Sequence, residues 1–242
     1  IEFDGHVRVK GTVRSGFSIK CGSLFAQEID QGKVFAVGDV VVQFGIIGAN
    51  IQTEGNIRSN FVTDSIIKCF GNVTIGKEII NSKVWVSQKF TAENGRAISS
   101  FISAKMGVIV KEVGNDTSPP CRFQVGRDEN SRKRIQAYDC ILEDKTRELE
   151  KLQRQYEKHL KNQIATPGKH SPTGKSQQAV SVFDNLPEKN IHEDLTKIET
   201  LIKQIERVSN QKTTTLNWST REKGNPVVKV RKRFLGNGSE YI

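Results

Sequence analysis

The sequence predicts a mainly β protein, a parallel β-solenoid interrupted by an antiparallel coiled-coil hairpin. Three observations predict it: a repeat in the first half, an abrupt change to helix-forming residues after Gly126, and strand alternation near the C-terminus. The expected domains are a solenoid at 1–126, a hairpin at 127–222 with a flexible tip loop near 164–190, and strands returning to the solenoid at 223–242.

The repeat is carried by anchor glycines at a fixed spacing. Gly22, Gly38, Gly55 and Gly71 recur 16 or 17 residues apart, and Gln88 occupies the next position of the series. Apolar and polar residues alternate on both sides of each anchor, so each unit predicts two short strands around a corner. A corner glycine serves either a positive φ or a close backbone approach. Stacked units bury one inner column, made of Val34, Ile51, Ile67 and Val84.

An antiparallel sandwich with a turn every 8 to 12 residues is the alternative fold for these strands. A sandwich does not need a regular period, so the constant spacing favours the solenoid.

Two helical runs follow the repeat. The first has 4,3-spaced residues typical of a coiled-coil seam, namely Tyr138, Leu142, Lys145, Leu149, Leu152, Tyr156 and His159. Asp128 or Ser131 is placed to cap its start. The second has the same spacing, at Ile191, Leu195, Ile198, Ile202 and Ile205. Each apolar stripe needs a partner, which predicts an antiparallel pair joined by a Pro-, Gly- and Ser-rich loop.

The returning segment alternates again, with Val228 and Val230 on one side and basic residues on the other, while Lys232 interrupts the apolar side. Most of the net charge of +10 lies after Gly126. A basic stripe either protects an exposed strand edge or binds a ligand. The candidate partner-binding residues are the four cations of this stripe and two apolar residues of the loop, Lys229, Arg231, Lys232, Arg233, Phe183 and Leu186.

Composition excludes several classes of protein. With 36% hydrophobic and 26% charged residues, the chain is neither collagen-like nor wholly disordered. No stretch reaches the roughly 18 apolar residues of a membrane-spanning helix, and the start has no signal peptide. The first residue is not Met, which is expected of a fragment. The four cysteines lack CxxC spacing, so we expect reduced thiols, no metal site and a cytoplasmic location.

Catalysis is not expected. Acyltransferase solenoids have about 18 residues per coil and use a histidine as general base, whereas the period here is shorter and His6 precedes the regular coils. Carboxylates lie at differing offsets from the anchors, unlike the clustered acids of polysaccharide-cleaving solenoids. We therefore expect no catalytic residues, no cofactor and no small-molecule substrate.

Three segments carry a family resemblance: GDVVVQFGIIGANIQTEGNIRSNFVTDSIIKCFGNVTIGKEIINSKVWV, GRAISSFISAKMGVIVKEVGND leading into the helix, and the returning VVKVRKRFLGNG. In these segments the sequence resembles the flagellar assembly protein A family. The resemblance implies a right-handed β-solenoid interrupted by a coiled-coil hairpin, in a bacterial protein of flagellar assembly.

The function expected from these features is a non-enzymatic cytoplasmic scaffold or regulator of flagellar assembly or placement. Its partners would be proteins of the flagellar or polar machinery, bound by the solenoid and the hairpin. A self-polymerising or division-regulating solenoid is the alternative, because open ladder ends can pair and form homo-oligomers. A nucleic-acid or anionic-surface binder using the basic strand is a further alternative.

Overall fold

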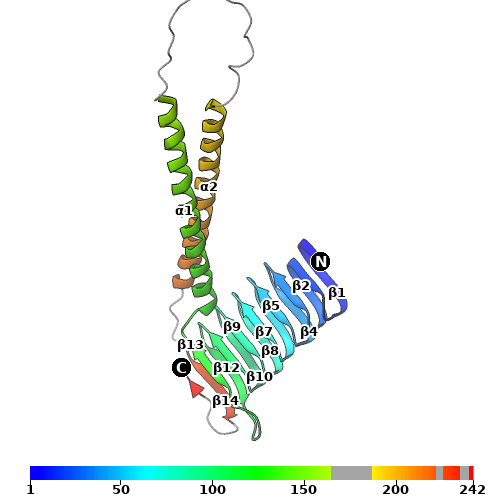
Figure 1. Ribbon diagram of the computed structural model, residues 1–242. Helices are drawn as coiled ribbons and strands as arrows, with labels where there is room; N and C mark the ends of the chain where they lie inside the picture. The colour runs from blue at the N-terminus through cyan, green and yellow to red at the C-terminus, as the bar shows by residue number, and fades with distance from the viewer. Residues whose placement is uncertain (165–186, 222–225, 235–239, 242) are drawn as a thin grey trace, which may run out of the picture. The chain divides into compact units, whose positions relative to one another are not determined.

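The computed structural model describes residues 1–164, 187–221, 226–234 and 240–241. The chain forms two compact units, one of residues 1–133 with 216–242 and the other of residues 134–215. The first unit contains the strands, and the second contains most of the two helices (Figure 1).

The first unit is a parallel β-solenoid of about 7 turns, as the sequence predicts. All described strand pairs are parallel, so the antiparallel sandwich is wrong. One side consists of short strands, β3 (Lys33–Ala36), β5 (Asn50–Thr53), β7 (Ile66–Cys69), β9 (Lys83–Val86), β11 (Phe101–Ala104), β13 (Arg122–Val125) and β15 (Glu240–Tyr241). The other consists of longer strands, β4 (Val40–Ile47), β6 (Ile57–Thr63), β8 (Val73–Ile80), β10 (Phe90–Ile98), β12 (Val108–Val113) and β14 (Val228–Phe234).

The long strand β2 (Ser18–Asp30) contributes to both sides and pairs along its length with β1 (Glu2–Val13). In Figure 1, β1 lies at one end of the stack and β14 lies at the other end. The strand returning after the helices thus extends the solenoid, because β14 pairs with β12.

The core is a set of inward columns. The predicted column of Val34, Ile51, Ile67 and Val84 is confirmed, since the four side chains are fully buried and each faces the next in register. Burial of each such side chain contributes about 1.5–3 kcal/mol. The stack therefore holds together through apolar contacts between coils as well as through backbone hydrogen bonds.

The anchor glycines are required by close approach of backbones. None of Gly22, Gly38, Gly55 and Gly71 has a positive φ. A Cβ at Gly55 would lie 2.5 Å from the carbonyl carbon of Gly38, and a Cβ at Gly71 would lie 2.5 Å from the carbonyl oxygen of Gly55. Close approach of backbones, and not a positive φ, is therefore the reason for glycine at these corners.

A ladder of amide side chains follows the anchors. The Asp39 Oδ1 atom accepts hydrogen bonds from the backbone N of Asn56 at 2.7 Å and from its Nδ2 at 3.0 Å. Asn56 Oδ1 accepts equivalent bonds from Asn72 at 2.8 and 3.2 Å, and Asn72 Oδ1 accepts one from the Lys89 backbone at 3.2 Å. Consecutive coils are thus connected by side chains at this corner.

A second ladder lies at the corner before the short strands. The backbone N of Ser65 donates to Ser82 Oγ at 3.1 Å, and that of Ser82 donates to Ser100 Oγ at 3.2 Å. The preceding residues, Asp64 and Asn81, have φ of 50° and 46°. Asp and Asn tolerate this left-handed region better than most residues, so the local sequence suits the bend.

The second unit contains an antiparallel helix pair formed by α1 (Glu129–Ile164) and α2 (Pro187–Arg221). Contacts between described residues of the two helices include Lys212 Nζ at 2.5 Å from Asp139 Oδ1, Lys145 Nζ donating to Gln204 Oε1 at 2.6 Å, and His159 Nδ1 at 2.8 Å from Asp194 Oδ2. The predicted α1 seam is partly buried from Tyr138 to Tyr156, as expected of residues that face a partner, whereas His159 at its end is 46% exposed.

The seam predicted on α2 is partly wrong. Ile198 and Ile205 are partly buried as expected, but Leu195 and Ile202 are 38% and 40% exposed. Leu201 is buried in place of Ile202, with 6% of its surface exposed. Apolar residues form two adjacent lines on α2, and packing against α1 selects the line that contains Leu201. Residue spacing does not distinguish the two lines.

Gly55→Ala is expected to lower the free energy of unfolding by about 1–3 kcal/mol, because the added methyl overlaps backbone atoms that cannot move alone. Gly11→Ala in β1 is the matched control, since a Cβ there meets nothing within 4 Å. Urea unfolding of both variants checks this, and equal stability of the two would contradict the packing role of the anchor.

Candidate partner-binding surfaces

The basic strand β14 forms the end of the long-strand side. Val228 and Val230 are partly buried against the core, and Lys229 is exposed. The pairing of β14 with β12 shifts register between Val230 and Arg233. This bulge accounts for Lys232, which is exposed instead of interrupting the buried side.

One cation of this strand has a partner on the solenoid. Arg231 Nη2 lies 3.1 Å from Glu93 Oε1, and both side chains are about half exposed. For Arg233 the structure describes the backbone, which lies in register with Glu112. Phe183 and Leu186 lie outside the described residues. The structure therefore brings together the cations of β14 and leaves Lys229 and Lys232 exposed.

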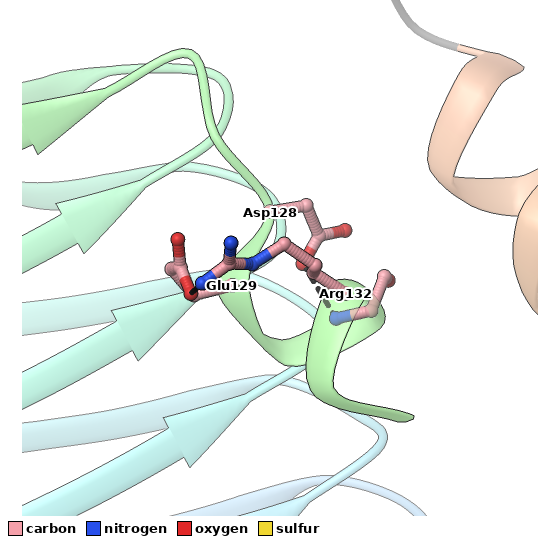
Figure 2. Close-up of polar contacts among 4 residues, drawn as sticks. Asp128, Glu129 and Arg132 are labelled. Carbon is pink, nitrogen blue, oxygen red and sulfur yellow. Dashed lines mark hydrogen bonds and ion pairs between the residues drawn. The ribbon is translucent and has the colours of Figure 1, made fainter. Parts of the chain in front are cut away.

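The start of α1 is held on the solenoid by polar contacts that the sequence reveals only in part. Of the two candidate caps, Asp128 is the one used: its Oδ1 accepts the backbone N–H of Ser131 at 3.0 Å. The same oxygen accepts the hydroxyl of Ser87 at 2.7 Å. Arg132 forms an ion pair with Glu129 at 2.9 Å. Figure 2 shows both residues beside Asp128 at the start of α1.

Asn130 strengthens this attachment. Its buried Nδ2 donates to the backbone oxygens of Cys69 at 3.1 Å and Trp85 at 3.0 Å, on two successive coils. The first turn of α1 is thus tied to strands β7 and β9 of the first unit. Sequence reasoning missed Asn130, because an asparagine in a helical run gives no signal of a distant backbone partner.

The last turn of α2 also contacts the solenoid within the first unit. Trp218 lies 6.2 Å from Phe70 between ring centroids, and Lys105 Nζ lies 5.9 Å from the Trp218 ring. Lys105 also donates to the backbone oxygen of Ser219 at 2.5 Å. Both ends of the helical insertion therefore have contacts on neighbouring coils.

The outward side chains of the short strands form a surface that we call the short-strand face. Its cations are Lys20, Lys33, Lys68, Lys83 and Arg122, and from β3 to β13 none of its outward positions is Asp or Glu. At the two ends of the face, Glu2 of β1 stands in register with Lys20 and Glu240 of β15 with Arg122. Its larger apolar side chains are Phe35, Ile66, Trp85 and Phe101. Along each short strand the outward positions alternate with buried ones, which the sequence pattern indicates. The sequence does not reveal that strands from seven coils share one surface.

The cysteines are free thiols. Burial raises the pKa of Cys69 to about 12 and also raises the pKa of Cys21 and Cys121. Cys21 and Cys69 lie in one inward column, three coils apart. Among the described residues, no group of three or more His, Cys, Asp or Glu side chains is placed to hold a metal ion.

Asp128→Ala is expected to lower the free energy of unfolding by about 1–2 kcal/mol, because the α1 start and the Ser87 hydroxyl both lose their acceptor. Asp128→Asn keeps an acceptor oxygen and is expected to cost less than half as much. Chemical denaturation measures both; an Ala variant as stable as the Asn variant would argue against the cap.

Native-state labelling with a maleimide near pH 8 is expected to modify Cys140 alone, since it is the exposed cysteine of the four. At that pH the thiolate fraction of Cys69 is roughly one part in ten thousand. Mass spectrometry counts the labels: one is expected for the folded chain, none for Cys140→Ser, and four after unfolding in denaturant. Rapid labelling of the folded Cys140→Ser variant would contradict the burial of the other thiols.

The comparisons with known proteins agree with this architecture. The family model described as the Flagellar Assembly Protein A beta solenoid domain matches residues 1–238. No curated protein and no solved structure matched the chain. The matched range covers strands β1 to β14 and both helices. The chain therefore belongs to the flagellar assembly protein A β-solenoid family.

Proposed function

We propose that the chain is a non-enzymatic scaffold in bacterial flagellar assembly or placement, which holds flagellar or polar proteins against its solenoid and its helices. The family match over residues 1–238 carries this proposal, because it includes both units. A solenoid suits the role, since stacked coils give an extended surface that needs no rearrangement on binding.

The attachment of the helices supports a recognition role for them. The contacts of Asp128 and Asn130 fix the first turn of α1 on the solenoid, and Trp218 packs on Phe70 near the end of α2. A merely tolerated insertion would not need such contacts at both ends. Between these ends, α1 and α2 present long polar outer faces to solvent.

Two observations support a non-enzymatic, cytoplasmic protein. Burial and a raised pKa make Cys21, Cys69 and Cys121 poor nucleophiles. Free thiols are typical of a reducing compartment.

As a separate finding, no helix in the described part of the chain is long and apolar enough to cross a membrane.

Within this function, we assign a contact for acidic partners to the exposed cations of β14, Lys229 and Lys232, with Arg231 and Arg233 beside them. Phe183 and Leu186 remain candidates for an apolar contact. Cationic side chains on an outer strand attract a partner of opposite charge and set its association rate more than its final affinity.

The test is an affinity pull-down from a flagellated bacterium that carries a homologue of this chain. The intact chain is compared with one in which residues 134–215 are replaced by a short Gly-Ser linker, which retains Asp128, Asn130 and Trp218. Flagellar or polar proteins are expected with the intact chain and are expected to be lost or reduced with the variant. Recovery of no such protein by either form would contradict the proposal.

A matched pair of variants tests the contribution of β14. Lys229→Gln/Lys232→Gln is expected to reduce recovery of acidic partners several-fold, mainly by slowing their association. Arg58→Gln/Lys77→Gln has the same change in net charge, at exposed positions of the long-strand side, and is the control. Equal recovery with both double variants would remove β14 from the binding surface.

A further inference from the structure

We propose that the short-strand face binds the surface of membranes rich in anionic lipid. This inference goes beyond a scaffold role and concerns a surface separate from β14. It is based on the charge of the face, its exposed apolar side chains and its size.

The face is cationic and acid-poor. Lys33, Lys68 and Lys83 project from it, and none of them forms an ion pair with another described residue. Lys20 differs, because it pairs with Glu2 of β1 at 2.5 Å. Carboxylates such as Glu54 lie beyond the strand ends, at a corner.

The long-strand side has a different pattern of charge. There Arg96 stands in register between Glu78 and Glu112, with its Nε atom 3.5 Å from Glu112 Oε2. Opposite charges on neighbouring coils balance one another in that column. Lys33, Lys68 and Lys83 have no such partner among the described residues, so the short-strand face attracts an anionic partner.

Apolar side chains stand exposed among the lysines. Phe35 and Ile66 are 43% and 41% exposed on the face, and Phe17 and Val37 at its margins are 61% and 69% exposed. A surface that combines lysine with exposed apolar side chains fits the headgroup region of a bilayer. The apolar groups enter the acyl boundary, and the lysines reach the phosphates through their flexible stems.

The aromatic contacts favour lipid over nucleic acid. The Trp85 ring is occupied by Lys133 Nζ at 5.4 Å and by the Phe101 ring at 5.7 Å, so it is not an open platform for a base. Ile66 and Val37 have no π-face on which a base could stack. The apolar side chains of Ile66 and Val37 are nevertheless suited to contact with hydrocarbon.

The size and composition of the face favour lipid over a protein partner. Four residues per strand and seven coils give a surface of roughly 13 by 34 Å, or about 440 Å². A stable protein interface buries about 800 Å² on each partner and is depleted in lysine. A fluid layer of anionic headgroups needs neither a matching shape nor that area.

The experiment is sedimentation of the full chain with vesicles of phosphatidylcholine, with or without about one third phosphatidylglycerol. Binding is expected to the anionic vesicles only and to weaken as salt is raised. Each lysine near an anionic surface contributes about fivefold to partitioning, so Lys33→Gln/Lys68→Gln/Lys83→Gln is expected to bind about a hundredfold more weakly. Phe35→Ser/Ile66→Ser is expected to weaken binding at least fivefold.

The matched control is Arg58→Gln/Lys77→Gln/Lys111→Gln, which removes the same charge from the long-strand side and is expected to change partitioning less than threefold. Melting curves of all variants show whether each is folded. Equal loss of binding in the two triple variants would overturn the assignment to this face. The proposal is also overturned by equal binding to neutral vesicles, or by lysine-dependent binding of a single-stranded DNA oligonucleotide without vesicle binding.

Discussion

The stacking of one coil directly on the next is the interaction on which this structure depends. At the anchor corner, the backbone N of Gly38 donates to the Gly22 oxygen, and that of Gly71 donates to the Gly55 oxygen at 3.0 Å. Such an approach leaves no space for a Cβ, so glycine recurs there. Once this corner is fixed, the residues of strands β3 to β7 meet their equivalents 16 or 17 positions later, and columns of like side chains follow.

The helical insertion is attached where the glycine series ends. Gln88 replaces the anchor glycine, and the residue before it, Ser87, binds the Asp128 cap. Asn130 then reaches the backbones of this coil and the preceding one. The departure from the repeat and the start of α1 are thus parts of one local arrangement. The corner of this coil therefore has side-chain contacts to the start of α1, through Ser87 and Asn130.

The two sides of the solenoid have different surface chemistry. In one column of the long-strand side, Glu78, Arg96 and Glu112 alternate in charge from coil to coil, and these charges neutralise one another. From β3 to β13, the short-strand side has lysines and exposed apolar groups and no outward Asp or Glu. The two sides of the solenoid therefore differ in how their charged side chains are paired.

The sequence by itself determined the solenoid, its period, the inner column through Val34, the two helices and the returning strand, because each depends on local periodicity or on a glycine at fixed spacing. Tertiary structure decided which apolar line of α2 is buried, with Leu201 in place of Ile202, since α2 alone presents both lines. It also decided the contacts of Asn130 and the membership of the short-strand face. These depend on residues far apart in the chain that meet only when the coils stack, and no local pattern records such meetings.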